Sequence, residues 1–203
     1  MHAAVAVALS YVIGSIPAAY LAGKSRGIDL RRYGSGNLGA TNVVRTLGWK
    51  VGLAVFAFDV AKGALPVLAF PRLVTGRPSG DVLAILCGLA TVLGHFRPIF
   101  LRFGKGGKGV ATAAGVFFAL APLPMLAALV VFALVVLASG YVSLGSLTAA
   151  VVLPALLLAM EGARSPVFQV SVLLALFVFW THRANIGRLR RGEEYRFGRK
   201  APS

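Results

Sequence analysis

Long uncharged stretches alternate with short segments rich in arginine, lysine and glycine along the whole chain. A helix needs about 20 mostly apolar residues to cross the hydrocarbon core of a bilayer, which is about 30 Å thick. The pattern predicts membrane-spanning helices over residues 3–22, 51–70, 82–96, 110–121, 125–139, 146–160 and 166–181. The sequence therefore predicts an all-α polytopic membrane protein with seven transmembrane helices, in which residues 1–203 form a single domain.

Two of these predicted helices share one uncharged stretch, residues 110–139. As a single helix this stretch would be about 45 Å long, which is too long for one untilted crossing. Pro122 and Pro124 lie near its middle, and proline disrupts the interior of a helix. We therefore expect a tight hairpin of two short spans. The first apolar stretch begins like a secretory signal but lacks a basic segment before it, so we expect a retained helix.

The charged residues decide the orientation. The chain has 21 Lys+Arg against 6 Asp+Glu, a net charge of +15, although only 13% of its residues are charged. Segments 24–50 and 97–108 and the tail from Arg183 hold six, four and seven of the 21 basic residues, whereas Arg72, Arg77 and Arg164 lie in the opposing loops. Positively charged loops stay in the cytoplasm, so the N-terminus is predicted outside and the C-terminus in the cytoplasm. Topology thus accounts for most of the charge, and no nucleic-acid partner is expected.

The first basic segment contains a glycine-rich motif over residues 34–42, Gly-Ser-Gly-Asn-Leu-Gly-Ala-Thr-Asn, followed by Arg45. Its spacing fits G-x-G-x-x-G, but no βαβ unit surrounds it, so dinucleotide binding is excluded. Glycines still let backbone N–H groups approach an anion closely. Hydroxyl and amide side chains add further hydrogen-bonding groups: Ser35, Asn37, Thr41 and Asn42. The alternative is a flexible polar turn with a helix cap.

The second basic segment ends in Gly-Lys-Gly-Gly-Lys-Gly at residues 104–109. Gly109 stands where a Walker A motif requires Ser or Thr, so this is not a P-loop of that class. Lys105 and Lys108 on a glycine-rich backbone nevertheless suit phosphate groups. A basic stop at the membrane interface would explain the lysines but not the glycines. His95 is either part of this site or a capped interfacial histidine.

The third basic segment follows the last predicted span, where His182, Asn185 and Arg188 would lie near one face of a helix. A positive-inside anchor explains the neighbouring arginines but does not require His182 or Asn185. Ser143, in a polar break at residues 139–146, is either functional or a small helix-packing residue. Asp59 and Lys62 are spaced i, i+3 and can pair within the bilayer, as a structural ion pair or as a substrate contact.

These segments bring cations, backbone N–H donors and small hydroxyl groups together on one face of the membrane. Such a set of groups suits a multiply charged anion such as phosphate. The H-x-x-x-x-D signature of glycerolipid acyltransferases is absent, because Val7, Phe100 and Gly187 stand where its aspartate would be. The single cysteine, Cys87, excludes an internal disulfide, and no metal-ligand cluster or cofactor site is expected. An enzyme of this kind would work by positioning and charge stabilisation of an activated substrate.

Several motifs, in order over nearly the whole chain, resemble the PlsY family of bacterial membrane acyl-phosphate:glycerol-3-phosphate acyltransferases. They are Gly14-Ser15-Ile16-Pro17, the motif at 34–42 with Arg45, Asp59 with Lys62-Gly63, Gly94-His95 with Pro98, Lys105–Thr112, Tyr141-Val142-Ser143-Leu144 and His182-Arg183 with Asn185-Ile186 and Arg188-Leu189. The resemblance implies acyl transfer from acyl phosphate to the 1-hydroxyl of glycerol 3-phosphate, giving lysophosphatidic acid and phosphate in phospholipid biosynthesis. It also implies seven helices in the bacterial cytoplasmic membrane, an active site that faces the cytoplasm and a protein that works as a monomer.

Carried over by motif position, the resemblance implies two sets of site residues. The catalytic set is Ser35, Lys105, Ser143, His182 and Asn185. The substrate-binding set is Gly36, Asn37, Gly39, Thr41, Asn42, Arg45, His95, Gly106, Gly107, Lys108 and Arg188. The donor would contact the residues of 35–42 and Lys105, while Arg45 and the residues from 143 onward would hold glycerol 3-phosphate. No protein general base is implied, since the donor phosphate can accept the proton.

One departure from the family pattern concerns the lysines. Gly104 separates Phe103 from Lys105, whereas the family motif runs from Phe directly into Lys-Gly-Gly-Lys-Gly, and this leaves open which lysine, 105 or 108, takes the family role.

Two functions other than acyl transfer would also use an anion-binding site. A carrier for phosphate or a phosphorylated metabolite would need internal repeats and broken helices near the midplane, and the chain shows no convincing repeat. A scaffold that binds anionic lipids would not depend on Ser35 or Asn185.

Overall fold

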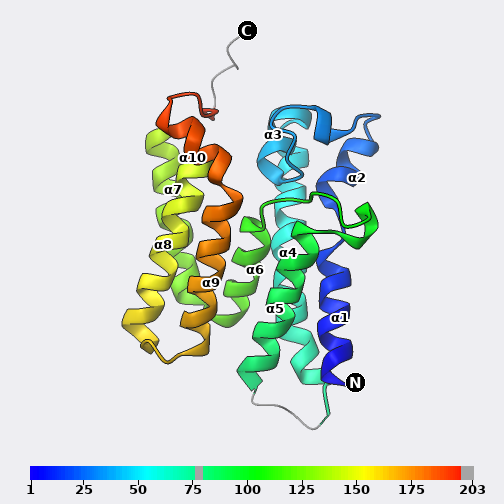
Figure 1. Cartoon of the computed structure of the whole chain (residues 1–203), viewed down its shortest axis with the longest axis vertical. Helices are drawn as coiled ribbons and strands as arrows, with labels where there is room; N and C mark the ends of the chain where they lie inside the picture. Colours follow the sequence, from blue (N-terminus) through cyan, green and yellow to red (C-terminus); the bar gives the residue numbers. More distant parts are fainter. Residues whose placement is uncertain (76–79, 198–203) are drawn as a thin grey trace. The chain divides into compact units, whose positions relative to one another are not determined.

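The computed structural model of the protein describes residues 1–75 and 80–197, and in these ranges all regular structure is helical. The chain forms two compact units, Met1–Leu120 and Ala121–Ser203 (Figure 1), which are described in turn. Three of the arginines and lysines counted for topology, Arg77, Arg199 and Lys200, lie outside the described residues. An all-helical fold was predicted from the apolar pattern, and this is confirmed.

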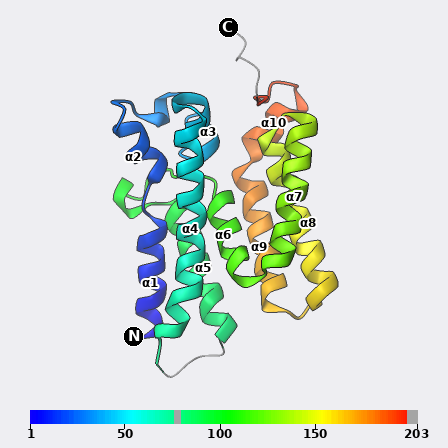
Figure 2. The same cartoon turned by 180° about the vertical axis from the view of Figure 1, so that it is seen from behind.

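The first unit is built on α4, which packs against α1, α5 and α6, while α1 also runs along α5. Its helices are α1 (Ala3–Gly14), α2 (Ala18–Lys24), η1 (Leu30–Arg32), α3 (Ala40–Leu47), α4 (Trp49–Leu73), α5 (Gly80–Phe96), η2 (Ile99–Leu101) and α6 (Val110–Leu120). Within this unit the N-terminus lies at the opposite end from α2 and α3 (Figures 1 and 2). The polar loops that the sequence singled out therefore lie away from the N-terminus.

The span predicted over residues 3–22 corresponds to the apolar stretch Ala3–Lys24, which is long enough to cross a membrane, but its helix is interrupted. α1 ends at Gly14 and α2 begins at Ala18, immediately after Pro17. Proline has no N–H and cannot continue the ladder of helical hydrogen bonds. The carbonyl of Ile16 at the break instead accepts a hydrogen bond from Lys62 Nζ at 2.9 Å. The break is thus held by a side chain of α4.

Close backbone packing joins α4 to α6 through two glycines. A Cβ atom on Gly63 would lie 2.1 Å from the carbonyl oxygen of Thr112, and one on Gly115 would lie 2.0 Å from that of Val60. Any side chain larger than hydrogen would therefore separate the two helices. Small residues at helix contacts are typical of membrane proteins, where apolar surface alone gives helices little reason to associate.

The second unit consists of α7 (Pro122–Ser139), α8 (Val142–Glu161), α9 (Pro166–Thr181) and α10 (Arg183–Arg190). α8 packs against both α7 and α9. The predicted bounds 166–181 of the last span are those of α9 and are confirmed. The helix begins there because Ser165 Oγ caps it by accepting hydrogen bonds from the N–H groups of Val167 and Phe168. α10 continues from α9 with a bend of 59°.

Other boundaries agree in part with the prediction. The division of residues 110–139 is confirmed, since α6 ends at Leu120 and α7 begins at Pro122. The polar break at 139–146 was predicted too long: Gly140, with φ +78°, ends α7, and α8 begins at Val142, so Ser143 lies in its first turn. The motif at 34–42 also does not end in a loop, because α3 begins at Ala40 and contains Thr41, Asn42 and Arg45.

Five helical stretches are long and apolar enough to cross a membrane, a sixth if α9 and α10 form one bent span, and α6 is a shorter apolar helix. Large apolar side chains are exposed along these helices. On α7, for example, Leu123 is 70% exposed, Leu134 59% and Leu137 82%. Water would penalise so much exposed apolar surface on a helix, whereas lipid tails would not. The chain is therefore a multi-pass membrane protein.

Candidate active site

The glycine-rich motif forms a tight loop before α3, and we call residues 34–42 the donor loop. Its conformation depends on Asn42, which is 1% exposed. The side chain of Asn42 accepts a hydrogen bond from the N–H of Ser35 at 2.9 Å and donates to the carbonyls of Leu30 and Tyr33 at 3.3 and 3.0 Å. Gly34 adopts φ +58° beside it, where a Cβ would lie 2.2 Å from Asn42 Oδ1. Asn42 thus organises the loop from inside.

The outer side of the donor loop carries hydrogen-bonding groups without partners. Within residues 1–75 and 80–197, the backbone N–H groups from Asn37 to Thr41 reach no acceptor. The same holds for the side chains of Ser35, Asn37 and Thr41 in the described chain. Besides Asn42, Leu38 turns inward, where it is 3% exposed and packs in the cluster with Leu30 and Val43. A row of open N–H groups at a helix N-terminus is a site for an anion.

We call the second motif, residues 104–109, the lysine loop. Hydrogen bonds join it to the end of α5. Gly106 N–H donates to the carbonyl of Phe96 at 3.0 Å and Gly107 N–H to that of His95 at 3.3 Å. A Cβ on Gly107 would lie 2.1 Å from His95 Nε2 and 2.9 Å from the carbonyl oxygen of Leu38. The lysine loop and the donor loop therefore meet at Gly107, with the ring of His95 against them.

Gly104, the residue that departs from the family pattern, lies in a tight turn ahead of these contacts. Arg102 and Phe103 both adopt left-handed backbone conformations, with φ 52° and 57°. Phe103 N–H donates to the carbonyl of Pro98, and Gly104 N–H to that of Leu101, each at 2.9 Å. Gly104 therefore lies within this turn, and Gly106 and Gly107 after it bond to the end of α5.

The two lysines of this loop differ in their surroundings. Lys105 is exposed, and its ammonium group has no hydrogen bond or ion pair in the described part of the chain. Lys108 is half-buried and takes part in an interaction within the protein. Lys105 is thus the lysine that a ligand can approach.

A buried ion pair lies beneath the lysine loop. Lys62 Nζ lies 2.7 Å from Asp59 Oδ1, and each side chain is at most 3% exposed. His95 Nδ1 lies 3.6 Å from the same carboxylate oxygen. The pairing predicted for Asp59 and Lys62 is confirmed, and its contacts favour the structural alternative: the pair joins α4 to the break after α1 and to the histidine under Gly107.

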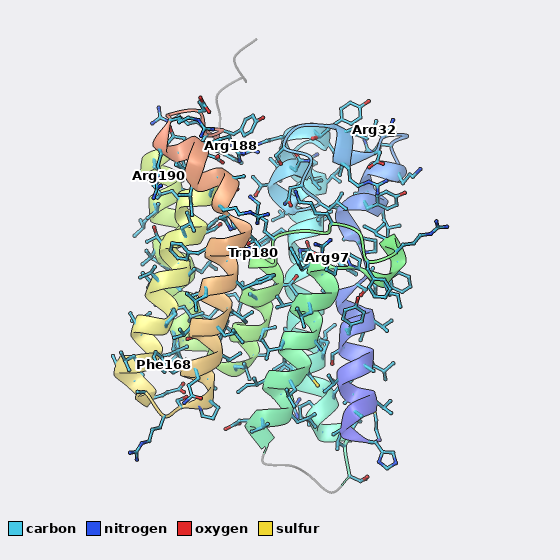
Figure 3. The ribbon with its side chains drawn as sticks, in the orientation of Figure 1. Arg32, Arg97, Phe168, Trp180, Arg188 and Arg190 are labelled. Carbon is cyan, nitrogen blue, oxygen red and sulfur yellow. The ribbon has the colours of Figure 1, made fainter. Side chains whose placement is uncertain are left out.

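The second unit contains a separate polar cluster, which we call the Glu194 cluster: Ser143, Asn185, Arg188 and Glu194. Glu194 Oε1 accepts a hydrogen bond from Ser143 Oγ at 3.1 Å and another from Asn185 Nδ2 at 2.8 Å. Its second oxygen, Oε2, accepts from Arg188 Nε at 2.7 Å. The Glu194 side chain is 2% exposed. Figure 3 shows Arg188 at the α10 end of this unit, away from Phe168 near the start of α9.

Glu194 is the residue that the sequence analysis missed. It brings together Ser143, Asn185 and Arg188, which were selected from two separate motifs. Its contact with Ser143 spans 51 positions of the chain, a pairing that residue spacing does not reveal. One signal was available: the chain has only six acidic residues, and Glu193 and Glu194 stand side by side within its most basic segment.

His182 lies between α9 and α10 and is 3% exposed. Its Nδ1 lies 2.8 Å from the carbonyl oxygen of Val178. Because a carbonyl can only accept, the hydrogen belongs to Nδ1, and a neutral ring then carries an acceptor at Nε2. His182 also has a further interaction within the protein.

Each unit thus contains some of the predicted site residues. The first holds the donor loop, Arg45 on α3, His95 and the lysine loop. The second holds the Glu194 cluster and His182. Asn42 is engaged inside its loop, and Arg45 is exposed and makes an interaction within the protein.

Comparison with known proteins identifies the family. The family model for glycerol-3-phosphate acyltransferase matches residues 4–192. A glycerol-3-phosphate acyltransferase of Geobacter metallireducens is 51% identical over 188 residues, which cover 93% of this chain and 94% of the relative. That of Geotalea daltonii is 46% identical over 190 residues, which cover 94% and 95%.

Two solved structures share the fold. The crystal structure of PlsY (YgiH), an integral membrane glycerol 3-phosphate acyltransferase, in its glycerol 3-phosphate form has a TM-score of 0.88 and 40% identity, covering 97% of this chain and 96% of the other. Its lysophosphatidic acid form has a TM-score of 0.84 and 39% identity, with coverage of 97% and 95%. The multi-pass helical fold, the glycine-rich motifs and these relatives agree: the chain belongs to the glycerol-3-phosphate acyltransferase family and is a membrane-bound acyltransferase.

Proposed function

We propose that the protein transfers an acyl group from an acyl phosphate to the 1-hydroxyl of glycerol 3-phosphate. The products are lysophosphatidic acid and inorganic phosphate. The known relatives are named for the acceptor, glycerol 3-phosphate, and solved forms of PlsY are described with that acceptor and with lysophosphatidic acid. The choice of acyl phosphate as the donor rests on the motifs of the chain and on the character of its open donor groups.

The observation that carries the proposal is the row of open N–H groups from Asn37 to Thr41, with Lys105 exposed on the adjoining loop. These groups all donate hydrogen bonds, and the described residues provide no carboxylate partner for Lys105. A phosphate with several acceptor oxygens matches such a set. We therefore assign the phosphate of the acyl phosphate to the donor loop and the lysine loop, with Ser35, Asn37, Thr41 and Lys105 in contact with it.

The chemistry needs little beyond this arrangement. The oxygen of the 1-hydroxyl attacks the acyl carbon, a new C–O ester bond forms, and the bond from the acyl carbon to the phosphate oxygen breaks. The phosphate leaves with the electron pair and takes the hydroxyl proton. Donors aimed at the leaving phosphate stabilise the charge that develops on it, and binding both substrates supplies proximity.

We assign glycerol 3-phosphate to the residues of the second unit, Ser143, His182, Asn185 and Arg188, together with Arg45. Asn42 and His95 act by shaping the two loops, since both lie within the loop structure. In this proposal the protein works as a monomer without a metal ion or cofactor. Every residue assigned in this proposal either contacts a substrate or positions a residue that does.

We further propose seven crossings, with α6 and α9 counted beside the five longer stretches, the N-terminus outside and the C-terminus in the cytoplasm. The distribution of basic residues supports this, because six, four and seven of the 21 lie in segments 24–50, 97–108 and from Arg183 onward. The active site then faces the cytoplasm from the inner membrane of a bacterium.

A phosphate-release assay tests the proposal. Purified protein in detergent should release phosphate from palmitoyl phosphate only when glycerol 3-phosphate is present, with one lysophosphatidic acid formed per phosphate. Activity with palmitoyl-CoA but not with palmitoyl phosphate would refute the proposed donor. Uptake of labelled glycerol 3-phosphate into proteoliposomes without acylation would instead show a carrier.

A further inference from the structure

The segment that links α5 to the lysine loop combines exposed apolar side chains with arginines. We call residues 97–103, Arg-Pro-Ile-Phe-Leu-Arg-Phe, the aromatic turn. We propose that the aromatic turn is a binding site for an anionic phospholipid of the surrounding bilayer. In this site Ile99, Phe100 and Phe103 enter the acyl-chain layer, and the two arginines, Arg97 and Arg102, bind the phosphate of the headgroup. The inference goes beyond the proposed function and does not depend on it.

The apolar residues of the aromatic turn are of two kinds. Pro98 is buried, and Leu101 packs against a buried apolar cluster of the first unit. By contrast, Ile99 is 41% exposed, Phe100 58% and Phe103 57%. Water would penalise three large exposed apolar side chains on one short turn, whereas acyl chains would not. The outer side of the turn therefore suits an apolar environment.

Contacts with two helices hold the aromatic turn in place. Tyr11 Oη of α1 donates a hydrogen bond to the carbonyl of Arg97 at 2.6 Å, and Arg97 N–H donates to the carbonyl of Leu93 on α5 at 2.8 Å. Arg102 and Phe103 adopt left-handed conformations, which residues with a Cβ rarely keep unless surrounding contacts impose them. The exposed side chains therefore have a defined place beside α1 and α5.

The aromatic turn lies where a stretch that can span the membrane ends. The apolar stretch Asp81–Leu101 is long enough to cross a membrane, and its last residues belong to the turn. The 17 residues of α5 make a helix about 25 Å long, slightly less than the hydrocarbon core of about 30 Å. Figures 1 and 2 show the turn at the outer edge of the first unit, beside α1 and α2. The turn is therefore at the depth where acyl chains give way to headgroups.

The two arginines supply the charge that an anionic headgroup needs. The guanidinium group of Arg97 lies 5.0 Å from the ring centre of Phe96, and one of its terminal nitrogens lies 3.5 Å from the carbonyl oxygen of Phe103. Arg102 is exposed, and its side chain makes no hydrogen bond or ion pair in the described residues. Neither arginine has a carboxylate partner in that part of the chain. Acyl chains and a phosphate in one molecule match this combination of groups.

Photo-crosslinking from position 100 tests the site directly. Benzoylphenylalanine, a photoreactive relative of phenylalanine, replaces Phe100 in the full-length protein. The protein is reconstituted into vesicles that contain equal parts of phosphatidylglycerol, which is anionic, and phosphatidylcholine, which is neutral overall. After irradiation, mass spectrometry identifies the cross-linked molecules. We expect cross-links to phospholipid, with phosphatidylglycerol favoured over phosphatidylcholine by at least about fivefold.

Two controls accompany this measurement. Arg97→Gln and Arg102→Gln, introduced together, should bring the ratio of the two lipids to within about twofold of equality while cross-links to lipid persist. Arg26→Gln is the matched charge control, because the side chain of Arg26 is exposed and has no hydrogen bond or ion pair in the described chain; it should leave the ratio unchanged. The same probe at Val130, an exposed position in the middle of the uncharged helix α7, should cross-link both lipids without preference.

The proposal is overturned if the ratio at position 100 equals that at position 130, or if the paired arginine variant keeps the ratio of the wild type. Cross-links to another polypeptide, or the absence of cross-links to lipid, would also contradict it, because the turn would then face protein or water. Failure of the proposed function would appear separately, as absent phosphate release, and would leave these cross-links unaffected.

Discussion

The donor loop and the Glu194 cluster are built from similar residues but differ in what their polar groups already contact. In the donor loop, the side chains of Ser35 and Asn37 and the backbone N–H groups from Asn37 to Thr41 have no partner in the described chain. In the Glu194 cluster, Ser143, Asn185 and Arg188 all donate to one buried carboxylate. The first region therefore presents open donors, whereas in the second a buried carboxylate engages a donor of each of the three side chains.

Under the proposed function, this difference bears on how the protein tells its two phosphorylated substrates apart. Charge alone cannot do so, because both substrates carry a phosphate. An array of open donors with an unpaired lysine favours the group with the greatest density of acceptors, which is a phosphate. Within the described residues, the donor loop and Lys105 make no hydrogen bond or ion pair with a carboxylate, whereas Glu194 engages three side chains of the second unit.

Removal of the open cation should have the largest effect. We expect Lys105→Ala to lower kcat/KM by about 100-fold or more, because it removes a charge aimed at the leaving phosphate. Lys24→Ala is the control, since Lys24 is an exposed lysine whose ammonium group lies 5.9 Å from the ring centre of Tyr20. Steady-state kinetics with palmitoyl phosphate measures both. An activity near that of the wild type in Lys105→Ala would remove the lysine loop from the site.

Asn42→Asp reverses the direction of hydrogen bonding inside the donor loop. The new carboxylate could accept from Ser35 N–H but could not donate to the carbonyls of Leu30 and Tyr33. Leaving buried acceptors without donors should destabilise the folded state by about 2 kcal/mol. Thermal unfolding in detergent should show a lower midpoint, with activity reduced in parallel. A midpoint equal to that of the wild type would mean that the amide does not organise the loop.

Ser35→Ala should lower turnover by about tenfold, equivalent to about 1.4 kcal/mol in the barrier. The hydroxyl of Ser35 has no partner in the described residues, so its removal disturbs no internal contact. Ser25→Ala is matched to it, because Ser25 Oγ is exposed and bonds only to the carbonyl of Ala22. We expect the control to retain full activity. If Ser35→Ala kept the turnover of the wild type, the assignment of the donor phosphate to the donor loop would lose its support.

The smallest effect concerns Asp29, a carboxylate paired with arginine at the surface, unlike the buried Glu194. A hydrogen bond from the side chain of Arg31 is the main reason that the pKa of Asp29 falls from 3.8 to about 2. Because the folded-state pKa is the lower one, the pair stabilises the fold above about pH 4, and this contribution is lost as the pH falls towards 2. Asp29→Asn should therefore lower the melting temperature slightly at pH 7. The gap from the wild type should narrow from pH 4 to 2 and close as the pH falls through 2, and a gap as large at pH 2 as at pH 7 would contradict the assignment.

The apolar pattern predicted most helices because their ends carry local signals. α9 was predicted with its observed bounds, since Ser165 and Pro166 form a capped start. The separation of α6 from α7 followed from Pro122 and Pro124. The break between α1 and α2 was missed although Pro17 is present. The carbonyl of Ile16 at this break accepts from the nearby N–H of Ala18 and also from Lys62, 46 positions away. Hydropathy carries no information on such a distant partner.

The same limit applies to the site. The family motifs selected Ser35, Lys105, Ser143 and Asn185 by their positions in the sequence. They could not show that Asn42 faces into its loop or that Glu194 collects three of the selected residues. Both facts depend on which direction a hydrogen bond takes, and that direction is set by tertiary structure.

The most direct test of this account compares the two serines, Ser35 and Ser143, one from each region. KM values for palmitoyl phosphate and for glycerol 3-phosphate are measured separately for Ser35→Ala and Ser143→Ala in purified protein. The account predicts a crossed result: Ser35→Ala raises the KM for palmitoyl phosphate and Ser143→Ala raises the KM for glycerol 3-phosphate, each by about tenfold with the other within about twofold. If both variants raise the same KM, the division between a donor region and an acceptor region is wrong.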